Sequence, residues 1–369
     1  MRVKIGDLTK IRTGKLDANV STEDGEYPFF TCSKEPLKIA SYSYDCECVL
    51  VAGNGDLNVK YFNGKFDAYQ RTYIIESNGN EKLYMPYLYY FMKGYVDELR
   101  KQAIGGVIKY IKLGNLTDAL IVLPDVKTQK KVVGILDKVK GVLDNRNLQI
   151  NNLDTLIKAR FVEMFGNPIS NTFGWKVCSL SDCLINIENG KSFICSDEPR
   201  HGDHPAVLKL SAATYGEYRP NENKAILDEA KFVVSAEVHP DDLLFTRKNT
   251  PELVGMCAYV SNTPPKLMMP DLIFRLNTND RCNKIFLWKL INLDVFRVHI
   301  EAIATGSAKS MSNISKERLG QLRIILPPLE LQEKFATFVA QVDKSKVAIQ
   351  KSLDEAQLLF DSLMQKYFG

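Results

Sequence analysis

The chain has 369 residues, of which 45% are hydrophobic and 25% charged, and its formal net charge is +4. This composition excludes a disordered chain and is typical of a folded protein long enough for two or more domains. The net charge is too small to indicate nucleic-acid binding by itself. No apolar run reaches the length of a membrane span and no N-terminal stretch has the order of a signal peptide, so we expect a cytoplasmic protein without membrane contact.

The eight cysteines do not form a metal-binding pattern, because none of them is separated from another by two residues. We therefore expect free thiols in a reducing compartment, with no bound metal and no cofactor. His201 and His204 lie near Cys195, but a fourth ligand at a suitable spacing is missing, and a polar loop is the better interpretation.

Strand and turn patterns alternate through residues 1–110 and again through residues 175–310. In both copies a glycine–lysine turn, Gly14-Lys15 or Gly190-Lys191, follows the opening segment. Apolar residues at helical spacing predict a helix over 84–99 in the first copy and over 285–300 in the second. The expected strands are 3–5, 27–30, 48–51 and 69–75, then 175–177, 204–207, 242–245 and 270–276.

A longer segment repeats without gaps after each globular part. Leu123-Pro124, Gln129 and Phe165-Gly166 recur 203 residues later as Leu326-Pro327, Gln332 and Phe368-Gly369. The unit is too long for a solenoid repeat, so we interpret the chain as two similar halves, each a globular part followed by a long helix. The offsets drift within the globular parts, which indicates one framework with different loops. Since loops on a scaffold usually carry specificity, the two halves are expected to read different targets.

Apolar residues in both repeated segments follow the a/d spacing of a heptad. We expect each helix to have about 35 residues and a length of roughly 50 Å. Arg146 occupies the first seam where Ile349 occupies the second, and Lys346 occupies the second where Leu143 occupies the first. The order of globe, helix, globe, helix favours antiparallel pairing of the helices over parallel pairing. The less favoured alternative is that each helix packs only on its own globe.

The run from Leu319 through Gln332, the segment Asn313-Ile314-Ser315 and the opening Trp175-Lys176-Val177 resemble the specificity subunits of Type I restriction–modification systems. The resemblance covers essentially the whole chain, although Tyr110-Ile111-Lys112 in the first copy departs from the asparagine–isoleucine–serine pattern. It implies an α+β fold, with two mixed α/β target recognition domains and two long helices that form an antiparallel coiled coil with pseudo-twofold symmetry. The implied domains are 1–124 and 169–327 for recognition, and 125–168 and 328–369 for the helical regions.

The resemblance also implies a function. Each recognition domain would read half of a bipartite, asymmetric site in double-stranded DNA, while the coiled coil sets the spacer and docks methyltransferase (M) subunits. Restriction and motor (R) subunits would join the complex. The chain itself is expected to be non-catalytic, since it lacks a methyltransferase Asp-Pro-Pro-Tyr motif and a P-loop. The alternatives are a coiled-coil adaptor that binds only proteins and a stand-alone enzyme, which the lack of a catalytic constellation disfavours.

Basic side chains near turns are the candidates for DNA contact, because Lys and Arg bind phosphates and Arg reads guanine. For any single residue, a solvated surface charge is the commoner outcome. Lys15 with Lys191, and Lys109 with Lys309, are expected to occupy matching places in the two halves, and the loop 246–250 is the sharpest candidate. The candidates are Lys15, Lys34, Lys60, Arg71 and Lys109 in the first half, and Lys191, Lys209, Arg247, Lys248 and Lys309 in the second.

Overall fold

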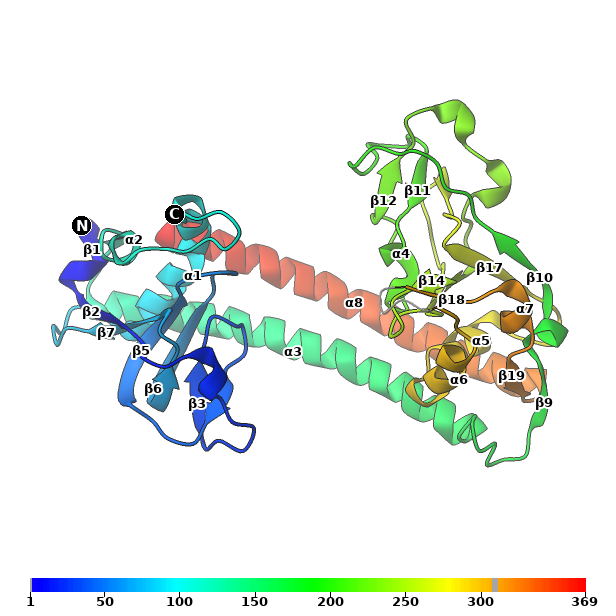
Figure 1. The fold of residues 1–369 in the computed structure, drawn as a ribbon, viewed down its shortest axis with the longest axis horizontal. Coiled ribbons are helices and arrows are strands. Elements are labelled where there is room, and N and C mark those ends of the chain that lie inside the picture. Colours follow the sequence, from blue (N-terminus) through cyan, green and yellow to red (C-terminus); the bar gives the residue numbers. More distant parts are fainter. Residues whose placement is uncertain (1, 307–310) are drawn as a thin grey trace. The chain divides into compact units, whose positions relative to one another are not determined.

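The computed structural model describes residues 2–306 and 311–369, whose contacts divide the chain into two compact units. Unit 1 comprises Met1–Leu148 and Ile349–Gly369, and unit 2 comprises Gln149–Ala348. Each unit thus holds one globular part together with a portion of both long helices, α3 (Val126–Phe165) and α8 (Leu329–Phe368) (Figure 1). The predicted division into four consecutive domains stays a prediction, since these contacts group each globular part with pieces of both helices.

Unit 1 is built on a six-stranded sheet with the strand order β2-β7-β5-β6-β3-β4. Helix α1 (Met85–Gln102) lies against this sheet (Figure 1). The short helix α2 (Leu113–Thr117) precedes β8, which pairs with β1. The strands are β1 (Arg2–Lys4), β2 (Thr9–Thr13), β3 (Tyr27–Phe30), β4 (Leu37–Ile39), β5 (Tyr44–Ala52), β6 (Val59–Ala68), β7 (Thr72–Ser77) and β8 (Leu120–Val122).

The second half of strand β5, residues 48–52, is buried on both faces, which explains why its sequence is an unbroken apolar run. Val49 and Val51 belong to the core that α1 and α3 share, whereas Cys48 and Leu50 belong to a second core on the other face. Successive side chains of a strand point to opposite faces, so a strand between two cores needs apolar residues at every position. The predicted strand at 48–51 is therefore confirmed as the centre of the unit 1 sheet.

Unit 2 contains a four-stranded sheet of order β10-β17-β13-β15 and a three-stranded sheet of order β12-β11-β16. In Figure 1, β11 and β12 lie at one end of this unit and α5, α6 and β9 at the other. The strands are β9 (Lys176–Ser179), β10 (Leu184–Asn189), β11 (Ala206–Leu208), β12 (Asn223–Ala225), β13 (Leu243–Thr246), β14 (Lys248–Asn249), β15 (Cys257–Tyr259), β16 (Leu267–Met268), β17 (Ile273–Thr278), β18 (Ser312–Asn313) and β19 (Arg323–Leu326). The helices are α4 (Ser211–Thr214), α5 (Lys284–Ile291), α6 (Arg297–Ala302) and α7 (Lys316–Gly320).

A buried glutamine ties each long helix to the globular part that precedes it. The side-chain oxygen of Gln129 accepts from the backbone N–H of Tyr84 at 2.8 Å, and its amide donates to the carbonyls of Lys82 and Pro124. In unit 2 Gln332 makes the same three bonds, accepting from Asn283 N–H at 2.8 Å and donating to the carbonyls of Arg281 and Pro327. The repeated glutamines of the sequence are thus repeated structural devices.

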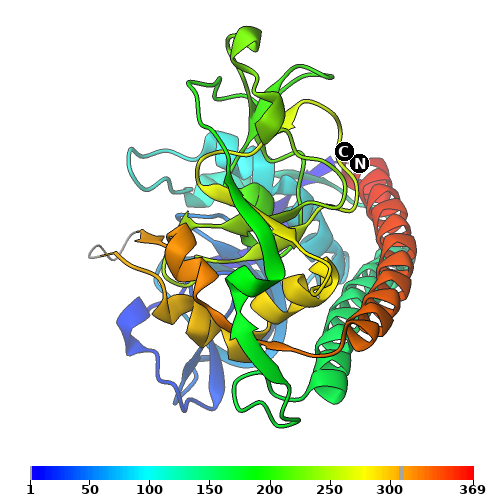
Figure 2. The same ribbon diagram turned by 90° about the vertical axis from the view of Figure 1, so that its right-hand side faces the viewer.

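The aromatic end of each long helix packs on a helix of one globular part, α1 in unit 1 and α5 in unit 2. Phe368, near the end of α8, lies 5.0 Å from the ring of Tyr87 on α1 in unit 1. Phe165, at the end of α3, lies 4.9 Å from the ring of Phe286 on α5 in unit 2. Each unit therefore buries the beginning of one long helix together with the end of the other. Figure 2 shows the two helices side by side in unit 2.

Some predicted elements differ from the observed ones. The strand expected over 270–276 begins only at Ile273. The strand expected from Tyr69 begins only at Thr72, since residues 69–72 form a turn closed by the Thr72 N–H and the Tyr69 carbonyl. The helix expected over 285–300 is interrupted after α5, where the Asn292 side chain bonds both backbone groups of Cys257 and the chain turns before α6. The long helices have 40 residues each rather than about 35.

Candidate nucleic-acid interface

Four of the five candidate residues of unit 1 surround the turn that follows β5. Gly53 N–H donates to the Arg71 carbonyl at 2.8 Å, and Gly55 N–H donates to the Lys109 carbonyl at 3.0 Å. Lys34 lies 3.8 Å from Asp56 in the same turn. The ammonium group of Lys60 donates to the Ser33 carbonyl at 2.6 Å, next to Lys34. Residues that are far apart in sequence are therefore brought to one turn, 53–58.

Lys15 lies next to the segment 68–72, whose Arg71 carbonyl contacts the turn 53–58. Gly14 N–H donates to the Thr72 carbonyl at 3.0 Å, and Gln70 N–H donates to the Leu16 carbonyl at 2.8 Å. A Cβ atom at Gly14 would lie 2.1 Å from the Ala68 carbonyl oxygen, so only glycine allows this approach. Gly190 has the same restriction in unit 2, where its Cβ would meet the Pro270 carbonyl at 2.1 Å.

The five cations of unit 1 differ in how available they are. Lys15, Lys34, Arg71 and Lys109 are exposed. Lys60 is half-buried, and burial lowers the pKa of its ammonium group, which also donates to the side chain of Asn58. Lys60 therefore joins two loops of the candidate surface, and the four exposed cations are the ones free to face a polyanion.

In unit 2 an arginine occupies the backbone position that Gly53 has in unit 1. Gly53 donates to the Arg71 carbonyl, and its own carbonyl accepts from Ile111 N–H at 2.9 Å. Arg247 donates to the Leu272 carbonyl at 3.0 Å, and its carbonyl accepts from Ile314 N–H at 2.8 Å. The backbone hydrogen bonds of the two units therefore coincide at this position, whereas the side chain is a hydrogen atom in Gly53 and ends in a guanidinium group in Arg247.

The Arg247 guanidinium group is held by an aromatic ring and an amide. Its central carbon lies 5.0 Å from the centroid of the Phe274 ring, and Nη2 donates to the Asn313 side-chain oxygen at 3.1 Å. Its Nε has no hydrogen-bond partner among the residues that the structure describes. That Nε atom is buried, so the ring and the amide fix the orientation of the guanidinium group, and contact with guanine or phosphate falls to its Nη groups. Lys316, which sequence reasoning missed, also lies over the Phe274 ring, at 5.8 Å.

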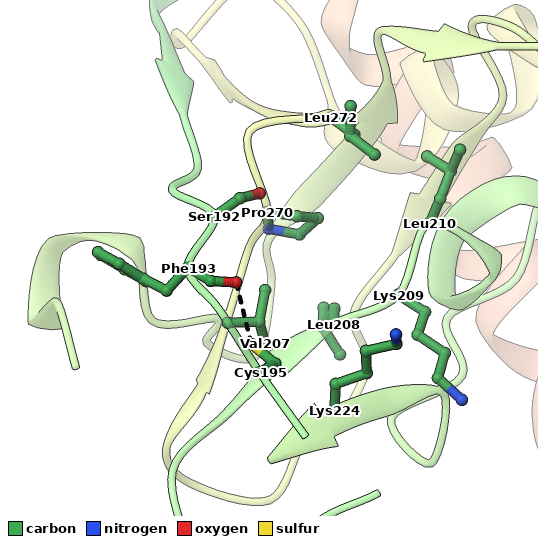
Figure 3. A pocket seen from close by; sticks show the side chains of 10 residues that line it. All are labelled: Ser192, Phe193, Cys195, Val207, Leu208, Lys209, Leu210, Lys224, Pro270 and Leu272. Carbon is green, nitrogen blue, oxygen red and sulfur yellow. Dashed lines mark hydrogen bonds between the residues drawn. The ribbon is translucent and has the colours of Figure 1, made fainter. Parts of the chain in front are cut away.

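Lys209 lines a pocket of about 310 Å³ in unit 2 (Figure 3). Lys191 directly precedes Ser192, another lining residue. Lys224, a second residue missed from the sequence, extends on the same side of the pocket as Lys209 (Figure 3). The rest of the lining is mostly apolar, which suits a flat organic group held next to an anion. The remaining lining residues are Phe193, Cys195, Val207, Leu208, Leu210, Pro270 and Leu272.

The expected match between Lys109 and Lys309 is wrong. The Lys109 carbonyl accepts from Gly55 N–H, two residues after Gly53. In unit 2 the residue two positions after Arg247 is Asn249, and it pairs with Ser312. Ser312 therefore takes the place of Lys109, because the loop of unit 2 is two residues longer. Lys309 itself lies outside the described residues. By contrast, Lys15 and Lys191 do occupy matching places, each directly after its restricted glycine.

The described residues contain no group of three or more His, Cys, Asp and Glu side chains that could hold a metal ion. His204 uses its ring to bind the Ile226 carbonyl at 2.8 Å and to approach Glu229 at 3.1 Å. All eight cysteines are free thiols. Within the described ranges, no helix is both long and apolar enough for a bilayer crossing.

Sequence comparison places these features in a known family. The pattern of the Type I restriction modification DNA specificity domain matches residues 1–153 and 173–357. The chain is 36% identical over 156 residues to the Type I restriction enzyme EcoDI specificity subunit of Escherichia coli, a match that covers 42% of this chain and 34% of that protein. It is 32% identical over 192 residues to the EcoEI specificity subunit of the same species, covering 52% and 32%. The chain thus spans about a third of the length of these two relatives.

The fold is also found among solved structures. The crystal structure of the S subunit of a Type I restriction–modification system from M. genitalium superposes with a TM-score of 0.63 at 15% identity, covering 100% of this chain and 96% of that one. At this identity the likeness concerns the fold alone. Because the family pattern matches both halves, the chain belongs to the family of Type I restriction modification DNA specificity domains.

Proposed function

We propose that this chain is the DNA sequence-specificity subunit of a Type I restriction–modification complex, in which each globular part reads one half of a bipartite, asymmetric site. The observation that carries the proposal is the pair Gly53 and Arg247, which share their backbone hydrogen bonds and differ in side chain. A framework that stays fixed while the side chains that it carries change is suited to reading two different half-sites.

The long helices hold the two readers in this proposal. Packing of Phe368 on Tyr87 in unit 1 and of Phe165 on Phe286 in unit 2 supports an antiparallel coiled coil with pseudo-twofold symmetry. A helix of 40 residues is about 60 Å long at 1.5 Å per residue. Its length sets the spacer between the half-sites, and its surface docks the methyltransferase (M) subunits.

Catalysis belongs to partner subunits in this proposal. The methyltransferase subunits flip an adenine out of the double-stranded DNA that this chain positions, and restriction and motor (R) subunits complete the complex. The candidate contacts in unit 1 are the exposed Lys15, Lys34, Arg71 and Lys109. Those in unit 2 are the exposed Lys191 and the partly exposed Lys209, Arg247 and Lys248. Lys60 and Lys309 remain candidates. Lys60 would act by holding the loops of the unit 1 surface together.

The test is a map of methylated adenines in the host genome with the gene intact and deleted. We expect a bipartite motif with two different halves and a fixed spacer, which disappears on deletion. A gel shift with DNA of that motif, with and without methyltransferase subunits, gives the affinity and its dependence on salt. A methylation pattern unchanged by deletion, together with no sequence preference in the gel shift, would favour the protein-only adaptor.

A further inference from the structure

Two adjacent apolar side chains protrude from the candidate interface of unit 1. Val107 is fully exposed and Ile108 is 62% exposed, at the tip of the loop between α1 and α2. We call these two residues the apolar tip. Scattered exposed apolar residues are ordinary, whereas two consecutive ones at a loop tip beside candidate contacts offer a small apolar surface to a ligand.

The loop that carries the apolar tip has a fixed backbone. Ile104 and Tyr110 exchange two hydrogen bonds, of 3.0 and 2.8 Å, across its base. Gly105 has a φ of +117°, and a Cβ atom there would lie 2.6 Å from the Ile108 carbonyl oxygen, so only glycine fits. Ile111 N–H then ties the end of the loop to the Gly53 carbonyl at 2.9 Å. The tip is therefore presented by a constrained loop and joined directly to the turn 53–58.

The surroundings of the apolar tip are cationic. Lys109 follows it directly, and Lys112 is exposed next to the loop. Asp56, the acidic residue of the turn 53–58, is already paired with Arg100 at 3.1 Å and lies near Lys34. An apolar point between cations complements a polyanion that offers an apolar group on its surface. In the major groove of DNA that group is the C5 methyl of thymine.

We propose that Val107 and Ile108 contact the C5 methyl group of a thymine in the half-site read by unit 1. The inference rests on the proposed function and deepens it, because it names the base and the chemical group that this loop selects. Lys109 binds an adjacent phosphate through its charge and so positions the tip without selecting the base.

The experiment replaces thymine by uracil, which removes only the methyl group. Gel shifts use the full chain, assembled with its methyltransferase subunits, on the bipartite target with each thymine of the unit 1 half-site replaced in turn. Wild-type binding is expected to weaken roughly three- to tenfold at one position, as expected for the loss of a single methyl contact. The double variant Val107→Ser/Ile108→Ser is expected to bind the thymine and uracil targets equally at that position.

Lys109→Ala is the matched control, since it should weaken binding to both targets and keep the preference for thymine. Circular dichroism checks that the variants are folded. Three results would overturn this inference but leave the proposed function intact. The first is sequence-selective binding that no uracil substitution weakens, and the second is a unit 1 half-site with no thymine on either strand. The third is a serine variant whose only defect is assembly with the methyltransferase subunits. The absence of any sequence-selective binding would overturn the proposed function, and this inference with it.

Discussion

Gln129 and Gln332 show how much a single buried side chain holds in this molecule. Each is fully buried and satisfies three backbone groups at the junction of a globular part with its long helix. Leucine has a similar size but no polar atom, so Gln129→Leu leaves an N–H group and two carbonyls unpaired. We expect a local cost of about 2–3 kcal/mol.

Hydrogen exchange measures this effect by region. In Gln129→Leu the backbone amides at the start of α1 should exchange faster, while those at the start of α5 keep their rates. Gln332→Leu should reverse the pattern and serves as the matched control. Equal acceleration in both regions would mean that the glutamines do not act within their own units.

Arg247 takes a backbone position that Gly53 has in unit 1. Arg247→Ala removes a stacked guanidinium, and we expect affinity for the cognate target to fall by about 1–3 kcal/mol with relaxed preference at one base of the unit 2 half-site. Binding selection from randomised DNA measures this, with Lys248→Ala as the control that lowers affinity without changing the preference. Loss of preference in the other half-site would contradict the assignment.

Lys289 makes stability depend on pH. Burial lowers its pKa to about 8 from 10.5; Asp343, Asp154 and Glu217 act against the shift, and Lys346 adds to it. Above pH 8 the folded chain loses this proton while the unfolded chain keeps it up to about 10.5, so stability rises with pH in that window. The gain for this group is up to roughly 3 kcal/mol.

Urea unfolding at several pH values, compared between wild type and Lys289→Met, isolates the contribution of this group. In the variant, the free energy of unfolding should lack the additional rise that Lys289 causes between pH 8 and 10.5. The pH dependence that the other lysines and the tyrosines cause should remain. Parallel curves for the two proteins would show that Lys289 is not desolvated.

At the scale of elements, a polar interruption marks the pairing of α3 with α8 in unit 2. Lys346 forms an ion pair with Asp154, and their side chains are 17% and 44% exposed. A partly buried pair in an apolar seam contributes more to choosing one register than to stability, because desolvation offsets much of its attraction. The interruption noticed in the sequence at Lys346 therefore has its partner on the other helix.

Removing one member of this pair should cost more than removing both. We expect Lys346→Met to destabilise by about 2–3 kcal/mol, and Asp154→Leu added to it to recover most of the loss. Thermal unfolding measures both, with Lys158→Met as control, because its pair with Asp294 is exposed and should contribute less than about 1 kcal/mol. If the double variant were as unstable as the sum of the two single variants, Lys346 and Asp154 would act independently and the ion pair would have no coupling energy.

At the scale of the whole molecule, the proposed role of the helices as a spacer can be tested by lengthening them. Seven residues inserted after Leu148 and seven after Ala348 add one heptad to both helices and preserve the a/d seam. This adds about 10 Å of helix, which corresponds to roughly three base pairs of DNA. We expect the methylated motif to keep both half-sites and gain that spacer.

The control carries seven residues inserted after Gly202, in an exposed loop of unit 2, and should keep the original spacer. The readout is the genomic methylation map of each strain. A lengthened chain that methylates the original motif would refute the spacer role, whereas loss of all methylation together with loss of folding would call for insertion of two heptads.

The sequence by itself determined the duplication, the long helices, the central strand at 48–51 and the repeated glutamines. These features are encoded locally, since apolar periodicity reports which face of an element is buried. The interruption after α5 escaped such reasoning because Asn292 is held by Cys257, a residue far away in sequence.

Only the tertiary structure decided which residues correspond between the halves and which cations are available. Loops of different length hid the match of Gly53 with Arg247 and of Lys109 with Ser312, and backbone hydrogen bonds disclosed it. Likewise the sequence could not separate Lys60, half-buried between two loops, from the exposed Lys15. The state of a charged side chain depends on neighbours that folding brings together, and no local pattern records them.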